Sequence, residues 1–184
     1  TDPSGTEAPS KVGSFLIWQQ PHLIYLAELL YRADPTKEVL EKYNRLVQET
    51  AEFMYSFATY DELEGRYVLK GAIPAQETLR AAETINPPFE LSYWHFAMQT
   101  AQQWRERMGQ QRSLEWDEMI DKLSPLASNK EGLYLAAETA TDTYKDIRYT
   151  SDHMAVLGAV GILPMNKLIR EDYMKNTLHW IWDN

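Results

Sequence analysis

The stretch PHLIYLAELLYRA (residues 21–33), followed by DPTKEVLEKYNRLVQETAEFMYSF (34–57), decides the fold class of this chain. The first segment is mostly apolar, and its leading proline suits a first helical turn. Asp34-Pro35 ends that segment, and Thr36 can cap a second helix. Apolar side chains recur in the second segment with a 3.6-residue period, which is a strong helical signal. We therefore expect two long helices joined by a short turn, the basic unit of an all-α fold.

The rest of the chain continues as helices separated by alternately short and long connections. Further helices are expected from Asn86-Pro87-Pro88 to Gly109, over 114–123, near 151–160 and over 166–183. RYVLK (66–70) reads as a short strand, and 132–149 is expected to be a long loop because it lacks a clean period. This order predicts helical hairpins around an axis, with short strands in long loops. Residues 1–13 are expected to form a flexible lead-in, and 14–184 a single domain.

Composition excludes several classes of protein. The chain has 184 residues and a net charge of −9, so it would repel the phosphate backbone of a nucleic acid. No stretch approaches the roughly 18 continuous apolar residues of a membrane span, and we expect none. The absence of cysteine removes disulfides, thiolate nucleophiles and cysteine-based zinc sites. The polar start of the chain would look the same after trimming, so the sequence leaves its location open.

Four polar segments carry the residues that could bind a ligand or catalyse a reaction. These residues are Trp18, Gln19, Gln20 and His22 in WQQPH; Gln76 and Glu77 in IPAQE; Asn86, Glu90 and Trp94 in NPPFELSYW; and Glu138, Asp142, Tyr144, Asp152 and His153 in AAETATDTY and the following SDH. The first three segments also fit ordinary roles: a helix N-terminus, a solvated carboxylate, and a helix start with a core stripe. The fourth fits such a role less well, because several polar groups crowd one loop.

The residue types narrow the chemistry to carboxylates. The four histidines, at 22, 95, 153 and 179, lack the spacing of a metal site, so neither a metal nor a cofactor is expected. A GxSxG nucleophile elbow and a P-loop are both missing from the sequence. In glycoside hydrolysis one carboxylic acid protonates the leaving oxygen and one carboxylate activates water. The six Trp and eleven Tyr could supply stacking platforms for a sugar, or they could fill helix–helix interfaces.

The order of the motifs resembles the catalytic (α/α)6 barrel of the six-hairpin glycosidases, and in particular glycoside hydrolase family 65 and its neighbour, the family 95 fucosidases. The motifs are a helix led by His22, then ETAEF (49–53), RYVLKGAIPAQE (66–77), NPPFELSYW (86–94) and SDHMAVLGAVGILP (151–164). In family 65 the strand leads to a GPDEYH-type turn that bears the general acid. IPAQE departs from that turn and is closer to the SPEN-type turn of the fucosidases.

The resemblance implies catalytic roles for three carboxylates. Glu77 takes the place of the general acid, and the family's spacing puts the base at Glu138, or at Asp142 if the fucosidase-like alignment holds. The other residues of the four polar segments would bind an oligosaccharide or glycoconjugate substrate. Tyr149-Thr150 stands where the phosphorylases have a Lys-Gln pair, which favours hydrolysis, with inversion as the expected outcome.

The resemblance also implies an incomplete toroid. The first hairpins of the barrel have no counterpart here, so this chain would be the C-terminal portion of a catalytic domain. Its partner would be the remaining N-terminal part of the same domain, and a periplasmic or secreted location is implied. The departure at IPAQE leaves open a non-catalytic carbohydrate-binding or scaffold toroid. A tetratricopeptide-like repeat protein is disfavoured, because the sequence has no 34-residue period.

Overall fold

The computed structural model describes residues 16–184, and this part of the chain is mostly α-helical. The predicted lead-in at 1–13 lies outside the described residues. Six α-helices, two short 3-10 helices and one two-stranded sheet make up the regular structure of the described part. The prediction of an all-α fold with short strands is therefore confirmed in its coarser form, a mostly-α fold. Within residues 16–184, every helix is too short or too polar to span a lipid bilayer.

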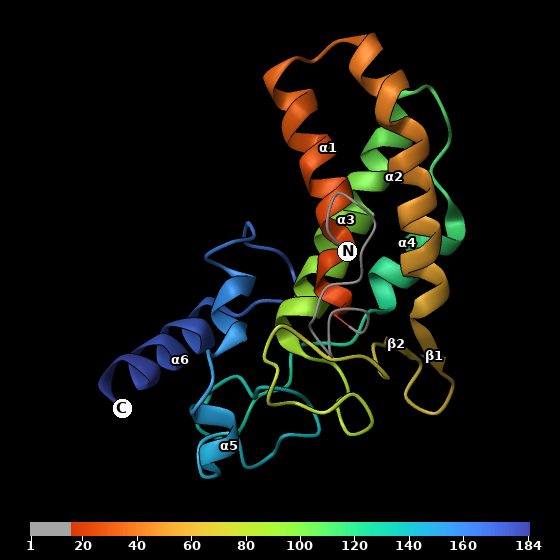
Figure 1. Cartoon of the computed structure of the whole chain (residues 1–184). Helices are drawn as coiled ribbons and strands as arrows, with labels where there is room; N and C mark the ends of the chain where they lie inside the picture. Colours follow the sequence, from red (N-terminus) through yellow and green to blue (C-terminus); the bar gives the residue numbers. More distant parts are fainter. Residues whose placement is uncertain (1–15) are drawn as a thin grey trace, which may run out of the picture.

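Helices α1 (Pro21–Ala33) and α2 (Lys37–Phe57) form the hairpin that the opening stretch predicts. The hydroxyl oxygen of Thr36 accepts the N–H of Val39 at 3.4 Å and so caps α2. The two helices lie side by side in Figure 1, and α3 (Pro88–Arg107) packs against both. The proline at the start of α1 and of α3 costs no hydrogen bond, because an N–H at that position has no partner within a helix.

Helix α3 forms the centre of the core. Trp94 and Trp104 are fully buried on it. Their indole N–H groups donate to the carbonyl of Met54 at 3.0 Å and to the carboxylate of Glu28 at 2.9 Å. A buried donor without an acceptor is costly, so these two bonds fix α3 against α2 and α1. Trp94, which the sequence suggested as a substrate contact, is therefore a core residue that ties α3 to α2.

The shorter elements follow the predicted order. Strands β1 (Thr59–Asp61) and β2 (Arg66–Val68) pair in antiparallel register, with Tyr60 opposite Tyr67, so the strand predicted in RYVLK is confirmed. Helix α4 (Leu114–Lys122) begins after Ser113, whose hydroxyl oxygen accepts the Trp116 N–H at 3.3 Å. The predicted cap at Ser113 is therefore also confirmed.

Two long loops lie at the same end of the helical hairpins. Residues 58–87 connect α2 to α3, and 123–146 lead from α4 to the short helix α5 (Ile147–Thr150). Figure 1 shows both loops near the ends where α1 and α3 begin. Most of the predicted site residues belong to these loops or to those helix starts, so the fold brings them to one end of the molecule.

The prediction of an α-helix near 151–160 is wrong. This segment forms only a 3-10 helix, η3 (Ala155–Ala159). Gly158 lies against the ring of Phe89, and a Cβ at this glycine would come within 3.0 Å of a ring carbon. Close packing on α3 therefore sets this backbone, and it overrides the local helical pattern.

The last helix begins later than expected. Helix α6 covers Glu171–Asp183, whereas the sequence predicts a start near 166. The side-chain oxygen of Asn166 accepts the Leu168 N–H at 3.0 Å, and the Tyr134 hydroxyl accepts the Arg170 N–H at 2.7 Å. In a helix starting at 166, the Arg170 N–H would bond to a backbone carbonyl of the preceding turn; here it bonds to Tyr134 instead, and α6 begins only at Glu171.

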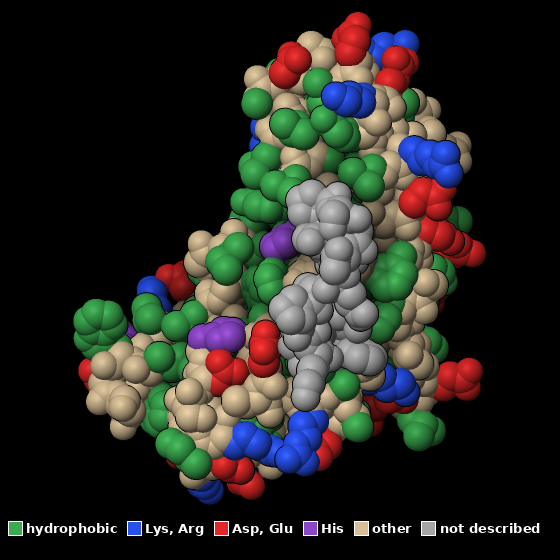
Figure 2. Space-filling view, in the orientation of Figure 1, with side chains coloured by type: hydrophobic (Ala, Val, Ile, Leu, Met, Phe, Trp, Pro, Cys, Tyr) green, Lys and Arg blue, Asp and Glu red, His purple; other side chains and the backbone are tan. Residues whose placement is uncertain are grey.

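One face of α1 is apolar and exposed. Figure 2 shows hydrophobic side chains gathered over this helix. The exposed fractions of Leu23, Leu26, Leu29 and Leu30 are 40%, 55%, 42% and 46%. A contiguous row of exposed leucines is unusual for a surface that faces only water, and it is typical of a contact surface.

Candidate active site

A cavity of about 410 Å³ lies where the loop 58–87 and the segment 153–162 meet the starts of α1 and α3. We call it the Glu77 cavity. It is lined by Trp18, His22, Ala75, Glu77, Phe89, His153, Met154, Ala155, Gly158 and Ile162. Four of these, Trp18, His22, Glu77 and His153, were singled out from the sequence. They come from three segments that are far apart along the chain, and only the tertiary structure brings them together.

The turn that carries Glu77 is held by the side chains of Glu90, Asp152 and His153. A carboxylate oxygen of Glu90 accepts the Ala75 N–H at 2.6 Å. The Nε2 atom of His153 lies 2.6 Å from the Ala75 carbonyl oxygen, and a carboxylate oxygen of Asp152 accepts the Thr78 N–H at 3.1 Å. Both flanks of Glu77 are therefore fixed. Glu77 itself is exposed and lines the cavity.

Gln76 supplies a further anchor for this turn. Its side chain is 1% exposed, and its amide nitrogen donates to the Tyr149 carbonyl at 2.7 Å. Gln76 and Glu77 therefore point to opposite sides, one into the protein and the other into the cavity. Gln76, suggested as a substrate contact, joins the turn to the α5 segment in this structure.

Asp152 and His153 form a pair. The Nδ1 atom of His153 lies 2.7 Å from a carboxylate oxygen of Asp152, and the backbone N–H of His153 donates to the same oxygen at 2.8 Å. Burial alone would raise the pKa of Asp152, but hydrogen bonds from the N–H groups of His153 and Thr78 lower it overall. Asp152 is therefore an ionised acceptor that both orients the imidazole and holds the Glu77 turn.

Glu90 is a buried carboxyl behind the cavity. It has no exposed surface, and burial raises its pKa to about 7 despite the hydrogen bond from Ala75. Its second oxygen, Oε2, has no hydrogen-bond partner among the described residues. Glu90 can therefore exchange a proton near neutral pH while remaining bound to the turn that carries Glu77.

His22 also lines the cavity, from the first turn of α1. Its Nδ1 atom is hydrogen-bonded to the Tyr93 hydroxyl, and its ring meets the indole of Trp18 edge-on, with 5.2 Å between centroids. Burial lowers the pKa of His22 and raises that of Tyr93. His22 is therefore a neutral ring held in a fixed orientation between two aromatic side chains.

Glu138, the residue suggested as general base, is held in a separate network and does not line the Glu77 cavity. Arg66 binds its two carboxylate oxygens at 2.7 and 2.8 Å, and the side-chain amide of Asn86 donates to one of them at 2.7 Å. The hydrogen bonds from Arg66 lower the pKa of Glu138 against the opposing effect of burial, and the bond from Asn86 adds to this. The side chains of Arg66 and Glu138 are 22% and 33% exposed.

The remaining sequence-derived residues lie in different places. Asp142 is exposed, and its backbone carbonyl accepts the N–H groups of Lys145 and Asp146. Gln19 is exposed, and Gln20 precedes α1 without making a side-chain cap. Tyr144 lines a second cavity together with Trp180.

Sequence reasoning missed the apolar side of the Glu77 cavity. Phe89 starts α3, and Met154, Ala155 and Ile162 come from the η3 segment. The only local signal was Gly158, whose lack of a side chain lets η3 approach Phe89. Among residues 16–184, no group of three His, Asp or Glu side chains is placed to hold a metal ion.

No family model matches the sequence, and no curated protein is significantly similar to it.

Proposed function

We propose that this chain is part of a glycoside hydrolase of the six-hairpin (α/α)6 type, similar to families 65 and 95, with Glu77 as general acid. The observation that carries this proposal is that Glu77 lines one cavity together with Trp18, His22 and His153. An indole ring offers a surface for the C–H face of a sugar, and ring nitrogens offer hydrogen bonds to its hydroxyl groups. A carboxyl group in such a cavity can reach a glycosidic oxygen.

In the proposed reaction, Glu77 gives its proton to the glycosidic oxygen as the bond to the anomeric carbon breaks. A water molecule attacks that carbon from the opposite face and loses its proton to a second carboxylate. In an inverting enzyme the two carboxyl groups are roughly 6.5–9.5 Å apart. Glu138 meets one requirement of a base, because Arg66 and Asn86 favour its ionised form. To accept a proton it would have to release one of those bonds, and exposed Asp142 is the alternative.

The proposal includes a larger toroid, of which α1–α4 form two hairpins. The exposed leucines of α1 support it, because further helices of the same domain would bury such a row. The partner in this case is the N-terminal part of the same catalytic domain.

A second candidate is a non-catalytic carbohydrate-binding or scaffold toroid. It is favoured by the observation that Glu138 is bound on both oxygens and lies outside the Glu77 cavity. In this case the cavity would bind a saccharide without cleaving it.

The test is hydrolysis of a panel of oligosaccharides by the full-length protein and its variants Glu77→Gln and Glu138→Gln. Exposed Glu62, on the β1–β2 turn, provides the matched control Glu62→Gln. We expect the first variant to lose at least about a hundredfold in kcat, the scale of general acid catalysis, and the control to keep the wild-type rate. Wild-type rates in both Glu77→Gln and Glu138→Gln would contradict the catalytic assignment. Binding without hydrolysis by the wild-type protein would support the second candidate.

A further inference from the structure

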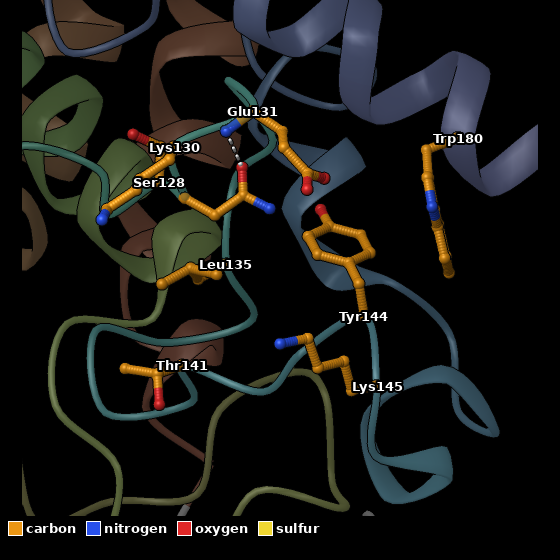
Figure 3. A pocket seen from close by; sticks show the side chains of 9 residues that line it. Ser128, Lys130, Glu131, Leu135, Thr141, Tyr144, Lys145 and Trp180 are labelled. Atoms are coloured by element: carbon orange, nitrogen blue, oxygen red, sulfur yellow. Dashed lines mark hydrogen bonds between the residues drawn. The ribbon is translucent and has the colours of Figure 1, made fainter.

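A second cavity, of about 660 Å³, lies between the loop 128–145 and helix α6. Figure 3 shows its lining, with Tyr144 and Trp180 on one side and Leu135 and Thr141 on the other. We call it the Trp180 cavity. We propose that it is a separate binding site for a neutral oligosaccharide. This inference goes beyond the proposed function, because the Trp180 cavity shares no lining residue with the Glu77 cavity and requires no catalysis.

The first observation is an aromatic corner. The rings of Tyr144 and Trp180 lie 4.5 Å apart between centroids and meet at 68°, so they form two walls instead of stacking on each other. The Tyr144 hydroxyl donates to the Tyr134 carbonyl, and this bond fixes one wall. A sugar ring placed in such a corner covers one aromatic face with its C–H groups and keeps its hydroxyl groups free. Because the corner is already formed, binding would order few side chains.

The second observation is a set of unused polar groups around this corner. The Glu131 carboxylate, the Lys145 ammonium and the side-chain amide nitrogen of Asn129 have no hydrogen-bond or ion-pair partner within the part of the chain that the structure describes. Figure 3 shows Glu131 and Lys145 on either side of Tyr144. Carboxylate oxygens accept, and ammonium and amide groups donate, so these side chains together match both roles of a sugar hydroxyl.

The lining of the Trp180 cavity carries charges of both signs. Lys130 and Lys145 contribute two positive charges to the lining, and Glu131 contributes one negative charge. The two ammonium groups would attract an anionic ligand, whereas Glu131 and the overall charge of −9 would repel it. A cation would find a single carboxylate beside two ammonium groups. A ligand rich in hydroxyl groups uses all of these side chains without placing like charges together.

The experiment exploits two tryptophans on one helix. Trp180 lines the cavity, whereas Trp182, on the same helix, is 86% exposed and lies outside it. Binding of neutral gluco-, galacto- and fuco-configured oligosaccharides is measured by calorimetry, and the indole N–H signals are followed by NMR. We expect at least one oligosaccharide to shift the Trp180 signal. We expect Trp180→Ala to weaken its binding about tenfold or more, and Trp182→Ala to leave it unchanged.

Two further variants guard against a folding defect in Trp180→Ala. Glu131→Gln and Lys145→Met alter exposed side chains, and each should weaken binding about threefold to tenfold while the melting temperature stays the same. Glu77→Gln should not change binding at this site, so failure of the proposed hydrolytic function would not remove the Trp180 signal. The proposal is overturned if no oligosaccharide shifts that signal, if both tryptophan variants bind equally, or if only inorganic phosphate or a uronic-acid oligosaccharide binds.

Discussion

Glu90 and Ala75 are joined by a hydrogen bond of 2.6 Å, in which a buried carboxylate of α3 accepts the backbone N–H of the turn that carries Glu77. A group that titrates near neutral pH therefore holds the segment that bears the proposed general acid. The relationship joins the buried core to the cavity, and it can be tested through stability as well as through activity.

The first prediction concerns the pH dependence of stability. Burial raises the pKa of Glu90 from 4.5 to about 7. A raised folded-state pKa stabilises the protein fully below the unfolded value, and this contribution is lost as the pH rises through about 7. The loss should approach roughly 3 kcal/mol. Glu90→Gln keeps an acceptor oxygen but cannot ionise, so this part of the decline should disappear. Urea unfolding at about pH 5 and about pH 8 measures it, with Glu62→Gln as the control. An unchanged decline in Glu90→Gln would rule out the assignment.

The second prediction concerns the rigidity of the Glu77 turn. Asp152→Ala removes the acceptor of the Thr78 N–H, so the Thr78 amide proton should exchange with solvent about tenfold faster or more. Asp152→Asn keeps an oxygen at this position and should restore most of the protection. Hydrogen exchange followed by NMR gives the rate at this single amide, and Asp142→Ala, in an exposed loop, is the control. Equal rates in the wild type and Asp152→Ala would show that Asp152 does not hold the turn.

The third prediction concerns Asn86, a buried residue in the left-handed region with a φ of 54°. Its side chain accepts the Leu69 N–H at 2.9 Å and donates to Glu138 at 2.7 Å. Asn86→Ala loses both hydrogen bonds and places an alanine in the left-handed region, which strains the backbone. We therefore expect it to lower the free energy of unfolding by about 3 kcal/mol. Asn86→Gly loses the same bonds without the strain and should be about 1 kcal/mol more stable than the alanine variant. Urea unfolding compares the two, and the reverse order would contradict this account.

The fourth prediction concerns Glu28, which is 1% exposed and accepts hydrogen bonds from Trp104, Arg107 and Arg32. Glu28→Ala leaves the buried indole N–H and both arginines without their acceptor, and should cost about 3–5 kcal/mol. Burial opposes ionisation, but these three donors lower the pKa of Glu28 overall. Its contribution is therefore present above the unfolded pKa and is lost as the pH falls through the lower folded value. Thermal unfolding at neutral and acidic pH measures both effects.

The matched control for Glu28 is Glu41→Ala, which removes an exposed carboxylate from an ion pair with Lys37. Such pairs contribute little because water screens them, so this variant should stay within about 0.5 kcal/mol of the wild type. A loss in Glu28→Ala as small as that of the control would show that the buried network does not stabilise the α1–α3 contact.

Local signals predicted much of the fold. The caps at Thr36 and Ser113 and the proline that begins α1 act within one turn of the chain, so the sequence shows them directly. The same holds for the 3.6-residue period of α2. The prediction of a helix around 151–160 was wrong: the segment forms only a short 3-10 helix, which packs closely on Phe89 of α3 at Gly158. That contact joins residues far apart in the chain, and no local pattern reveals it.

The sequence likewise predicted one part of the candidate site, and the tertiary structure decided the other part. Residue types and their order in the sequence pointed to Glu77, His22, Trp18 and His153 as candidate site residues. Only the tertiary structure decided that these four line one cavity. It also decided that Glu138 pairs with Arg66, and that Trp94 lies in the core. The sequence alone determined the helical hairpins, because capping and periodicity are properties of neighbouring residues. Only the tertiary structure decided which polar groups face a cavity and which hold the backbone, because each such hydrogen bond requires a partner from a distant segment.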